Sequence, residues 1–162
     1  MNQNLITSIK KILKIEDVYA HCDVPCGIYD PHLAQVSAFT VLRMVNLIGQ
    51  LDKAAPDYTH KYARYTAVKE EHAEQCKHEV RVIWGDFVKP EHLEKHKDLN
   101  DLVMSIMKKG SSARQTVDEA AAKALVDDVN KFAEVFWDLK GVKTHKIKAP
   151  YPTGGEMVVP AQ

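Results

Sequence analysis

The residue types best suited to chemistry are concentrated in one short segment near the N-terminus. His21, Cys22 and Cys26 bring one imidazole and two thiols together within six residues. Thiolate and imidazole groups are good ligands for nickel, copper and zinc. Structural zinc sites usually take four side-chain ligands, and this segment offers three. The spacing of the two cysteines alone is equally compatible with a disulfide, so the neighbouring histidine is what favours a metal site.

Residues 1–20, which precede this segment, have the spacing of an amphipathic helix. Lys10, Lys11 and Lys14 interrupt their apolar residues, so they lack the continuous apolar core of a secretion signal. Taken without the segment that follows, this pattern favours a permanent first helix. Together with that segment, it is interpreted as a propeptide that is cleaved between Ala20 and His21. The alternatives are a permanent first helix of the mature protein and a helix that lies on a membrane surface.

Cleavage before His21 would change what this segment can bind. The α-amine of His21 would then be available to a metal, with a pKa of about 8. This amine, the deprotonated backbone amide of Cys22 and the thiolates of Cys22 and Cys26 make an N2S2 donor set. Four strong donors favour a square plane, which is typical of Ni(II) or Cu(II), and the imidazole of His21 remains as an axial ligand. Anionic sulfur and amidate donors also stabilise a higher oxidation state, so the pattern predicts a redox-active metal.

The string His-Cys-Asp-x-Pro-Cys-Gly-x-Tyr, residues 21–29, resembles the nickel hook of the nickel-dependent superoxide dismutases. The resemblance extends to about residue 141. Weaker matches occur in the same order along the chain at Lys69-Glu70, Ala73-Glu74, Lys77-His78, Trp84 with Asp86, Lys89-Pro90 and Phe136-Trp137. It implies a helical subunit of a homohexamer, made with a propeptide that a processing peptidase removes.

The resemblance also implies an activity and a site. Superoxide would be converted to dioxygen and hydrogen peroxide while a nickel ion alternates between Ni(III) and Ni(II). His21, Cys22 and Cys26 would be the metal ligands, and the Val24–Pro25 bond would be cis. Asp23 and Tyr29 would line the approach of superoxide and are the candidate catalytic residues. The alternatives are a non-catalytic nickel or copper binding protein with the same hook, and a helical interaction protein with a labile disulfide.

Three positions depart from the pattern of the family. Ser37 and His72 stand where a glutamate and an arginine would support the axial imidazole. Phe87 stands where a second tyrosine would flank the site. The ligand set is complete, so the nickel assignment is unaffected. The neighbours that tune the affinity and the potential of the metal therefore differ from those of the family.

The remaining sequence predicts an all-α protein whose core is a four-helix bundle. We expect helices from Pro31 to about residue 54, from Asp57 to Ile83, from Pro90 to Gly110, and from a capping box at Thr116 to Gly141. The domain organisation would be a propeptide (residues 1–20), the hook plus bundle (21–141) and an irregular, Pro- and Gly-rich tail (142–162).

Composition and charge narrow the partners and the compartment. The 162 residues include 22 Lys and Arg against 22 Asp and Glu, so the basic excess of a nucleic-acid-binding protein is missing. No stretch is long and apolar enough to span a bilayer. Three cysteines fit a reducing compartment, and we expect a cytoplasmic protein with no nucleic-acid or membrane partner. We expect Cys76 to be a buried, inert thiol, and His92 and His96 to be packing or surface residues.

Overall fold

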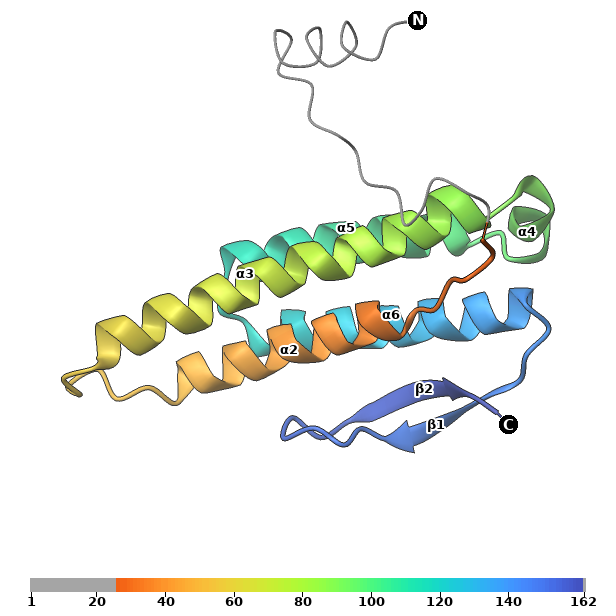
Figure 1. Cartoon of the computed structure of the whole chain (residues 1–162). Helices are drawn as coiled ribbons and strands as arrows, with labels where there is room; N and C mark the ends of the chain where they lie inside the picture. Colours follow the sequence, from red (N-terminus) through yellow and green to blue (C-terminus); the bar gives the residue numbers. More distant parts are fainter. Residues whose placement is uncertain (1–25, 162) are drawn as a thin grey trace, which may run out of the picture.

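Four long helices form the body of the molecule (Figure 1). The computed structural model describes residues 26–161. The long helices are α2 (His32–Gly49), α3 (Tyr58–Val82), α5 (Leu99–Gln115) and α6 (Glu119–Leu139). One turn of π-helix, η1 (Ile83–Phe87), and a short helix, α4 (Pro90–Lys95), connect α3 to α5. Strands β1 (Thr144–Lys148) and β2 (Glu156–Pro160) follow α6. The predicted four-helix bundle is confirmed.

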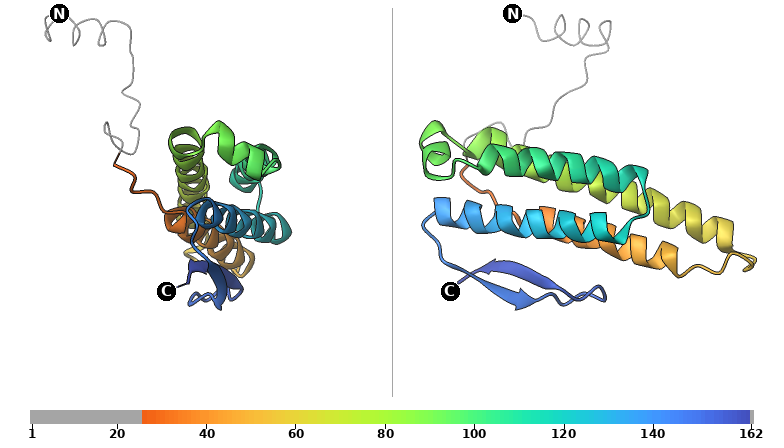
Figure 2. Two further views of the ribbon diagram at one scale, coloured as in Figure 1. Left: turned by 90° about the vertical axis from the view of Figure 1, so that its right-hand side faces the viewer. Right: turned by 180° about the vertical axis from the view of Figure 1, so that it is seen from behind.

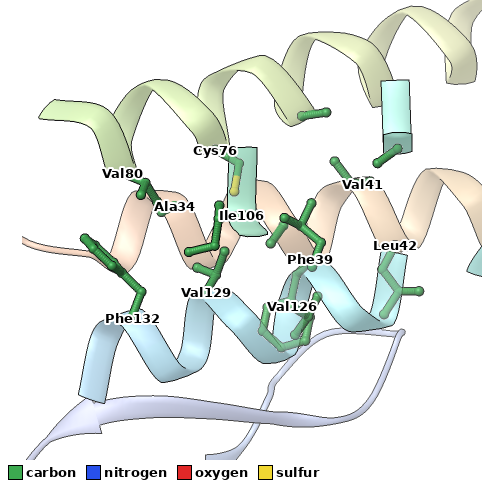
Figure 3. Packing of buried hydrophobic residues seen from close by; sticks show 14 of the residues in the cluster. Ala34, Phe39, Val41, Leu42, Cys76, Val80, Ile106, Val126, Val129 and Phe132 are labelled. Carbon is green, nitrogen blue, oxygen red and sulfur yellow. The ribbon is translucent and has the colours of Figure 1, made fainter. Parts of the chain in front are cut away.

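The helices are arranged as two layers with one common core. α3 and α5 form one layer, α2 and α6 form the other, and the two strands lie against the outer side of the second layer (Figure 2). Every long helix contributes a fully buried apolar side chain, for example Val41, Cys76, Ile106 and Val129 (Figure 3). Within the described part of the chain, no helix is both long and apolar enough to cross a membrane.

The first long helix begins where the sequence predicts and ends earlier. A carboxylate oxygen of Asp30 accepts a hydrogen bond from the backbone N–H of His32 at 2.8 Å, and the intervening Pro31 is buried. The helix ends at Gly49 instead of continuing to residue 54. After it, the Asp52 side chain accepts a hydrogen bond from the N–H of Ala54 at 2.9 Å and starts a turn. The expected length was wrong because this local turn competes with the helix.

The third predicted helix is two helices. α4 ends at Lys95, and the backbone of His96 leaves the helical conformation. The side chains of Lys95 and His96 both reach the Asp138 carboxylate on α6, at 2.7 Å each. The predicted stop at Gly110 was also wrong, since α5 runs through it. A Cβ at Gly110 would lie 2.7 Å from the side chain of Lys77, so close packing is what requires glycine there.

The last helix is capped by a different residue from the one predicted. Asp118 is the N-cap, and its carboxylate accepts hydrogen bonds from the N–H groups of Ala120 and Ala121. Thr116 instead bonds back to the carbonyl of Ser112 at the end of α5. The predicted glycine stop is confirmed at Gly141, where a φ of 71° suits glycine.

Residues 142–161 contain two strands, so the expectation of an irregular tail over 142–162 was wrong. β1 and β2 pair antiparallel as a hairpin, with Ile147 opposite Met157. The strands have five residues each, and the prolines and glycines between them hide the pattern in the sequence. Gly154 and Gly155, with φ of 63° and 87°, turn the chain back. Met157 is buried against the bundle, so the hairpin adds to the hydrophobic core.

A buried polar network fastens this hairpin to the bundle. The Asn130 side-chain oxygen accepts hydrogen bonds from the Gln35 amide at 2.9 Å and from the N–H of Val158 at 3.4 Å. The Asn130 amide donates to the carbonyl of Glu156 at 2.8 Å, and the Gln35 amide donates to the carbonyl of Val158 at 3.0 Å. One asparagine therefore satisfies backbone groups of β2 that the hairpin turns towards the protein.

We predict that Asn130→Ala lowers the free energy of unfolding by about 1–3 kcal/mol, because it leaves buried backbone groups without partners. Denaturant unfolding followed by circular dichroism measures this change. Asn100→Ala is the matched control. It removes only the exposed hydrogen bond from the Trp84 indole, 2.9 Å long, and should cost less than about 0.5 kcal/mol. Equal losses in the two variants would contradict the role given to the network.

Candidate metal centre

The structure describes the second half of the hook, Cys26 to Tyr29, which we call the hook base. Cys26 is exposed, and its Sγ accepts a hydrogen bond from the N–H of Ile28 at 3.4 Å. Gly27 has a φ of 70°, and a Cβ at this position would meet nothing within 4 Å, so the backbone angle alone requires glycine. His21, Cys22, Asp23 and the Val24–Pro25 bond lie outside the described residues.

Tyr29 packs the hook base against a group of aromatic rings at one end of the bundle. Its ring centroid lies 5.8 Å from that of Phe87. Phe87 in turn lies 5.1 Å from Phe136 and 5.2 Å from His92. Phe136 meets Trp137 edge-on at 5.0 Å. We call Phe87, His92, Phe136 and Trp137 the aromatic floor. Such tilted and stacked rings stabilise one another beyond the apolar area that they bury.

A π-helical turn is what brings Phe87 to this place. The sequence predicts a helix that ends at Ile83 and another that begins at Pro90, whereas residues 83–87 form η1. The N–H of Val88 closes it by bonding to the carbonyl of Ile83 at 3.3 Å. The wider turn places Phe87 at the end of α3, where it packs against the core and meets Tyr29. Single π-turns of this kind are frequent at functional sites.

Lys140, at the end of α6, completes the contacts of the hook base. Its Nζ lies 3.4 Å from the carbonyl oxygen of Gly27 and donates to it. The same ammonium lies 5.9 Å from the centroid of Phe87 and 5.6 Å from that of Phe136, within the range of a cation–π contact. Sequence reasoning missed Lys140. The signal that could have found it was its spacing from Phe136, since residues i and i+4 share one face of a helix.

The residues that depart from the family pattern come from three elements. Ser37 is buried on α2. His72 lies on α3, which packs against α2, and its Nδ1 lies 2.9 Å from the carbonyl of Val68. A carbonyl can only accept, so Nδ1 carries the hydrogen and the other ring nitrogen, Nε2, is left for a different partner. Phe87 contacts Tyr29 directly, without a hydroxyl of its own to offer.

The other candidate ligands are used for packing. His92 accepts a hydrogen bond at Nδ1 from the N–H of Lys89, whereas His96 bonds to Asp138, so the two histidines do not act as a pair. Cys76 is fully buried, and burial raises the pKa of its thiol to about 12. Among residues 26–161, no three His, Cys, Asp or Glu side chains form a candidate metal site.

A family model for nickel-containing superoxide dismutase matches residues 16–140. The chain belongs to this family. The nickel superoxide dismutases of Streptomyces coelicolor and Streptomyces seoulensis are 38% and 37% identical to it over 123 residues, which are 76% of this chain and 90% of each relative. The resemblance that the hook suggested is confirmed.

Solved structures agree with the sequence relatives. The native structure of a nickel superoxide dismutase superposes with a TM-score of 0.68 at 36% identity, over 74% of this chain and 99% of that one. A structure with nickel ligation corresponding to the oxidised state gives a TM-score of 0.69 at 34% identity, over 75% and 99%. The family model ends at residue 140, so the hairpin lies beyond the matched region.

The buried thiol of Cys76 should make the free energy of unfolding depend on pH. Folded Cys76 keeps its proton up to about pH 12, whereas an unfolded cysteine loses it near pH 8.5. The unfolded state thus binds fewer protons above that pH, and the free energy of unfolding should fall as the pH rises, by up to about 1.4 kcal/mol per unit. We predict that Cys76→Ala is less sensitive to pH between 8 and 10.5, measured by denaturant unfolding. If the free energy of unfolding fell equally with pH in the unaltered protein and in Cys76→Ala, the raised pKa of the Cys76 thiol would be contradicted.

Proposed function

We propose that this enzyme works at an N-terminal nickel site, made by His21, Cys22 and Cys26 once the chain has been cut before His21. As a member of the nickel-containing superoxide dismutase family, the chain is an oxidoreductase that converts superoxide to dioxygen and hydrogen peroxide, with nickel as its cofactor. The observation that supports the hook as the site is the exposed Cys26, which lies three residues before Tyr29, whose ring packs on Phe87 of the aromatic floor.

Cys26 is the proposed ligand that lies within the described residues, and its chemistry fits nickel. Cys26 offers a soft sulfur ligand at the surface, where a metal can reach it. The N–H of Ile28 points at this sulfur, and such a hydrogen bond favours the thiolate form that binds metal. The buried Cys76 has the opposite environment, since burial keeps its thiol protonated. The fold thus distinguishes one thiol suited to a metal from one suited to the core.

Bound nickel supplies one-electron redox chemistry between Ni(III) and Ni(II), by which two superoxide ions and two protons give one dioxygen and one hydrogen peroxide. The chain has to hold the ligands and admit a small anion. Tyr29 has its ring packed on Phe87, which restricts the directions in which its hydroxyl can point. We propose that this hydroxyl and the backbone around Asp23 line the approach of superoxide.

We further propose that the mature chain assembles as a homohexamer after a peptidase has removed residues 1–20. Two large exposed apolar side chains support an assembly, since Ile28 in the hook base is 72% exposed and Leu33, at the start of α2, is 52% exposed. Exposed apolar residues that gather near a site are common at subunit contacts. A reducing compartment such as the cytoplasm would keep the hook thiols available for nickel.

The proposal predicts that processing switches on activity. A chain that begins at His21 should bind nickel and dismutate superoxide, because its α-amine can join the ligand set. A chain that begins one residue earlier, at Ala20, is the matched control. There the nitrogen of His21 is a peptide amide, and activity with added nickel should be lost. Nickel content and the rate of superoxide decay measure both proteins, and equal activity would refute the amine ligand.

The two described cysteines allow a second matched comparison. In the chain trimmed to His21, Cys26→Ser should abolish dismutation, because an alcohol oxygen is a harder and much less acidic donor than a thiol. The circular dichroism spectrum of the bundle should stay unchanged. Cys76→Ser should keep activity and lose roughly 1 kcal/mol or more of stability, since it buries a hydroxyl in the core. Turnover by the Cys26→Ser protein would rule out this ligand.

A further inference from the structure

The hook base is already docked on the bundle in the unprocessed chain. Three contacts between residues that the structure describes help to order it. Tyr29 packs on Phe87, the N–H of Ile28 bonds to Cys26, and Lys140 donates to the carbonyl of Gly27. Of these three, only the contact of Lys140 ties the backbone of the hook to a different part of the chain by a charged group. Lys140 lies 113 positions after Gly27 in the sequence.

The position of Lys140 explains how its exposed side chain can stay in one conformation. Its ammonium lies over the rings of both Phe87 and Phe136, at 5.9 and 5.6 Å from their centroids. An ammonium in contact with two rings loses fewer conformations on binding a carbonyl than one in open solvent. Gly141, with its φ of 71°, ends α6 directly after this lysine and fixes where the side chain starts.

We propose that Lys140 is a positioning residue, which holds the hook base in the conformation that receives nickel before the metal arrives. The inference rests on the proposed function of the hook and adds a residue to it. A short chain segment that binds a metal has to be ordered by the binding, and any order already present in the metal-free protein strengthens the binding. Lys140 supplies such order at Gly27, directly beside the ligand Cys26.

A positioning role for Lys140 can be told apart from a merely structural one, because a structural role would act on the stability of the bundle. The residue is exposed, and its removal should change the stability of the bundle little. If it positions the hook, its removal should act on the mobility of Gly27 and Ile28 and on nickel affinity instead. An arginine should replace it, because a guanidinium also carries a charge, donates to carbonyls and stacks on aromatic rings.

The test uses Lys140→Met, which keeps an unbranched stem over the rings and removes the ammonium. Lys140→Arg tests rescue. Lys143→Met is the matched control, since Lys143 is also exposed, lies three positions further along the chain and changes the net charge equally. The first readout is the order of the Gly27 and Ile28 amides, measured by 15N relaxation in the metal-free full-length chain. The second is the nickel dissociation constant of the chain trimmed to His21.

We expect Lys140→Met to lower the order of both amides and to weaken nickel binding roughly three- to tenfold. Lys140→Arg should restore both, and Lys143→Met should change neither. The proposal is overturned if Lys140→Met behaves like the control, if arginine fails to rescue, or if affinity falls while the amides stay ordered. The relaxation readout needs no metal. A trimmed chain that binds no nickel at all would therefore refute the proposed function, while the contact of Lys140 would still be tested.

Discussion

A metal site built on the end of a chain depends on whatever holds that end in place. Ordering each backbone residue costs about 1–2 kcal/mol, and a hook of nine residues has little surface of its own to bury. The described part of this hook is ordered by contacts with the bundle: Tyr29 on Phe87, and Gly27 under the ammonium of Lys140. The four-helix bundle therefore does more than carry the hook, since its end face orders the hook base.

This constraint gives a reason for one local feature of the bundle. The π-helical turn at the end of α3 puts Phe87 against Tyr29. The fully buried Lys69 donates to the carbonyls of Ala113 and Arg114 in the last turn of α5, where the ends of helices leave carbonyls unpaired. Burial lowers the pKa of this lysine, so its place in the core depends on those carbonyls. Lys69 is also one of the residues that resembled the family, and the structure gives it a capping role.

Much of the fold could be predicted from the sequence, because the apolar periodicity of the long helices is strong. At Asp30-Pro31 and at Gly141 a single local signal decides the end, and the predicted boundary was correct. At the end of α2 and the start of α6 two local signals compete, and the prediction chose the wrong one. Where a distant contact decides an end, the prediction failed. Nothing near His96 in the sequence reveals that Asp138 will bind it, and nothing near Gly110 reveals the side chain of Lys77.

The candidate site also has a part that the local sequence reveals and a part that depends on distant contacts. The ligand types and their order are local, so Cys26 and its neighbours could be found in the sequence, as the family match confirms for the nickel assignment. The support for the site is not local, and Lys140 was missed because it acts on Gly27 across the fold. The hairpin was missed for a related reason, since its short strands gain their stability from Asn130 and the apolar face that they cover.

The hairpin also bears on how the site is held, although it lies beyond the region that the family model matches. It starts directly after Gly141, and the N–H of Ala161 at its far end bonds back to the carbonyl of Lys143 at 2.7 Å. Both ends of the hairpin are thereby fixed beside the last turn of α6. That turn carries Lys140, and an end of a helix that is held on both sides frays less than one that leads into open solvent. The hairpin thus restrains the end of α6, whose Lys140 holds the carbonyl of Gly27 in the hook base.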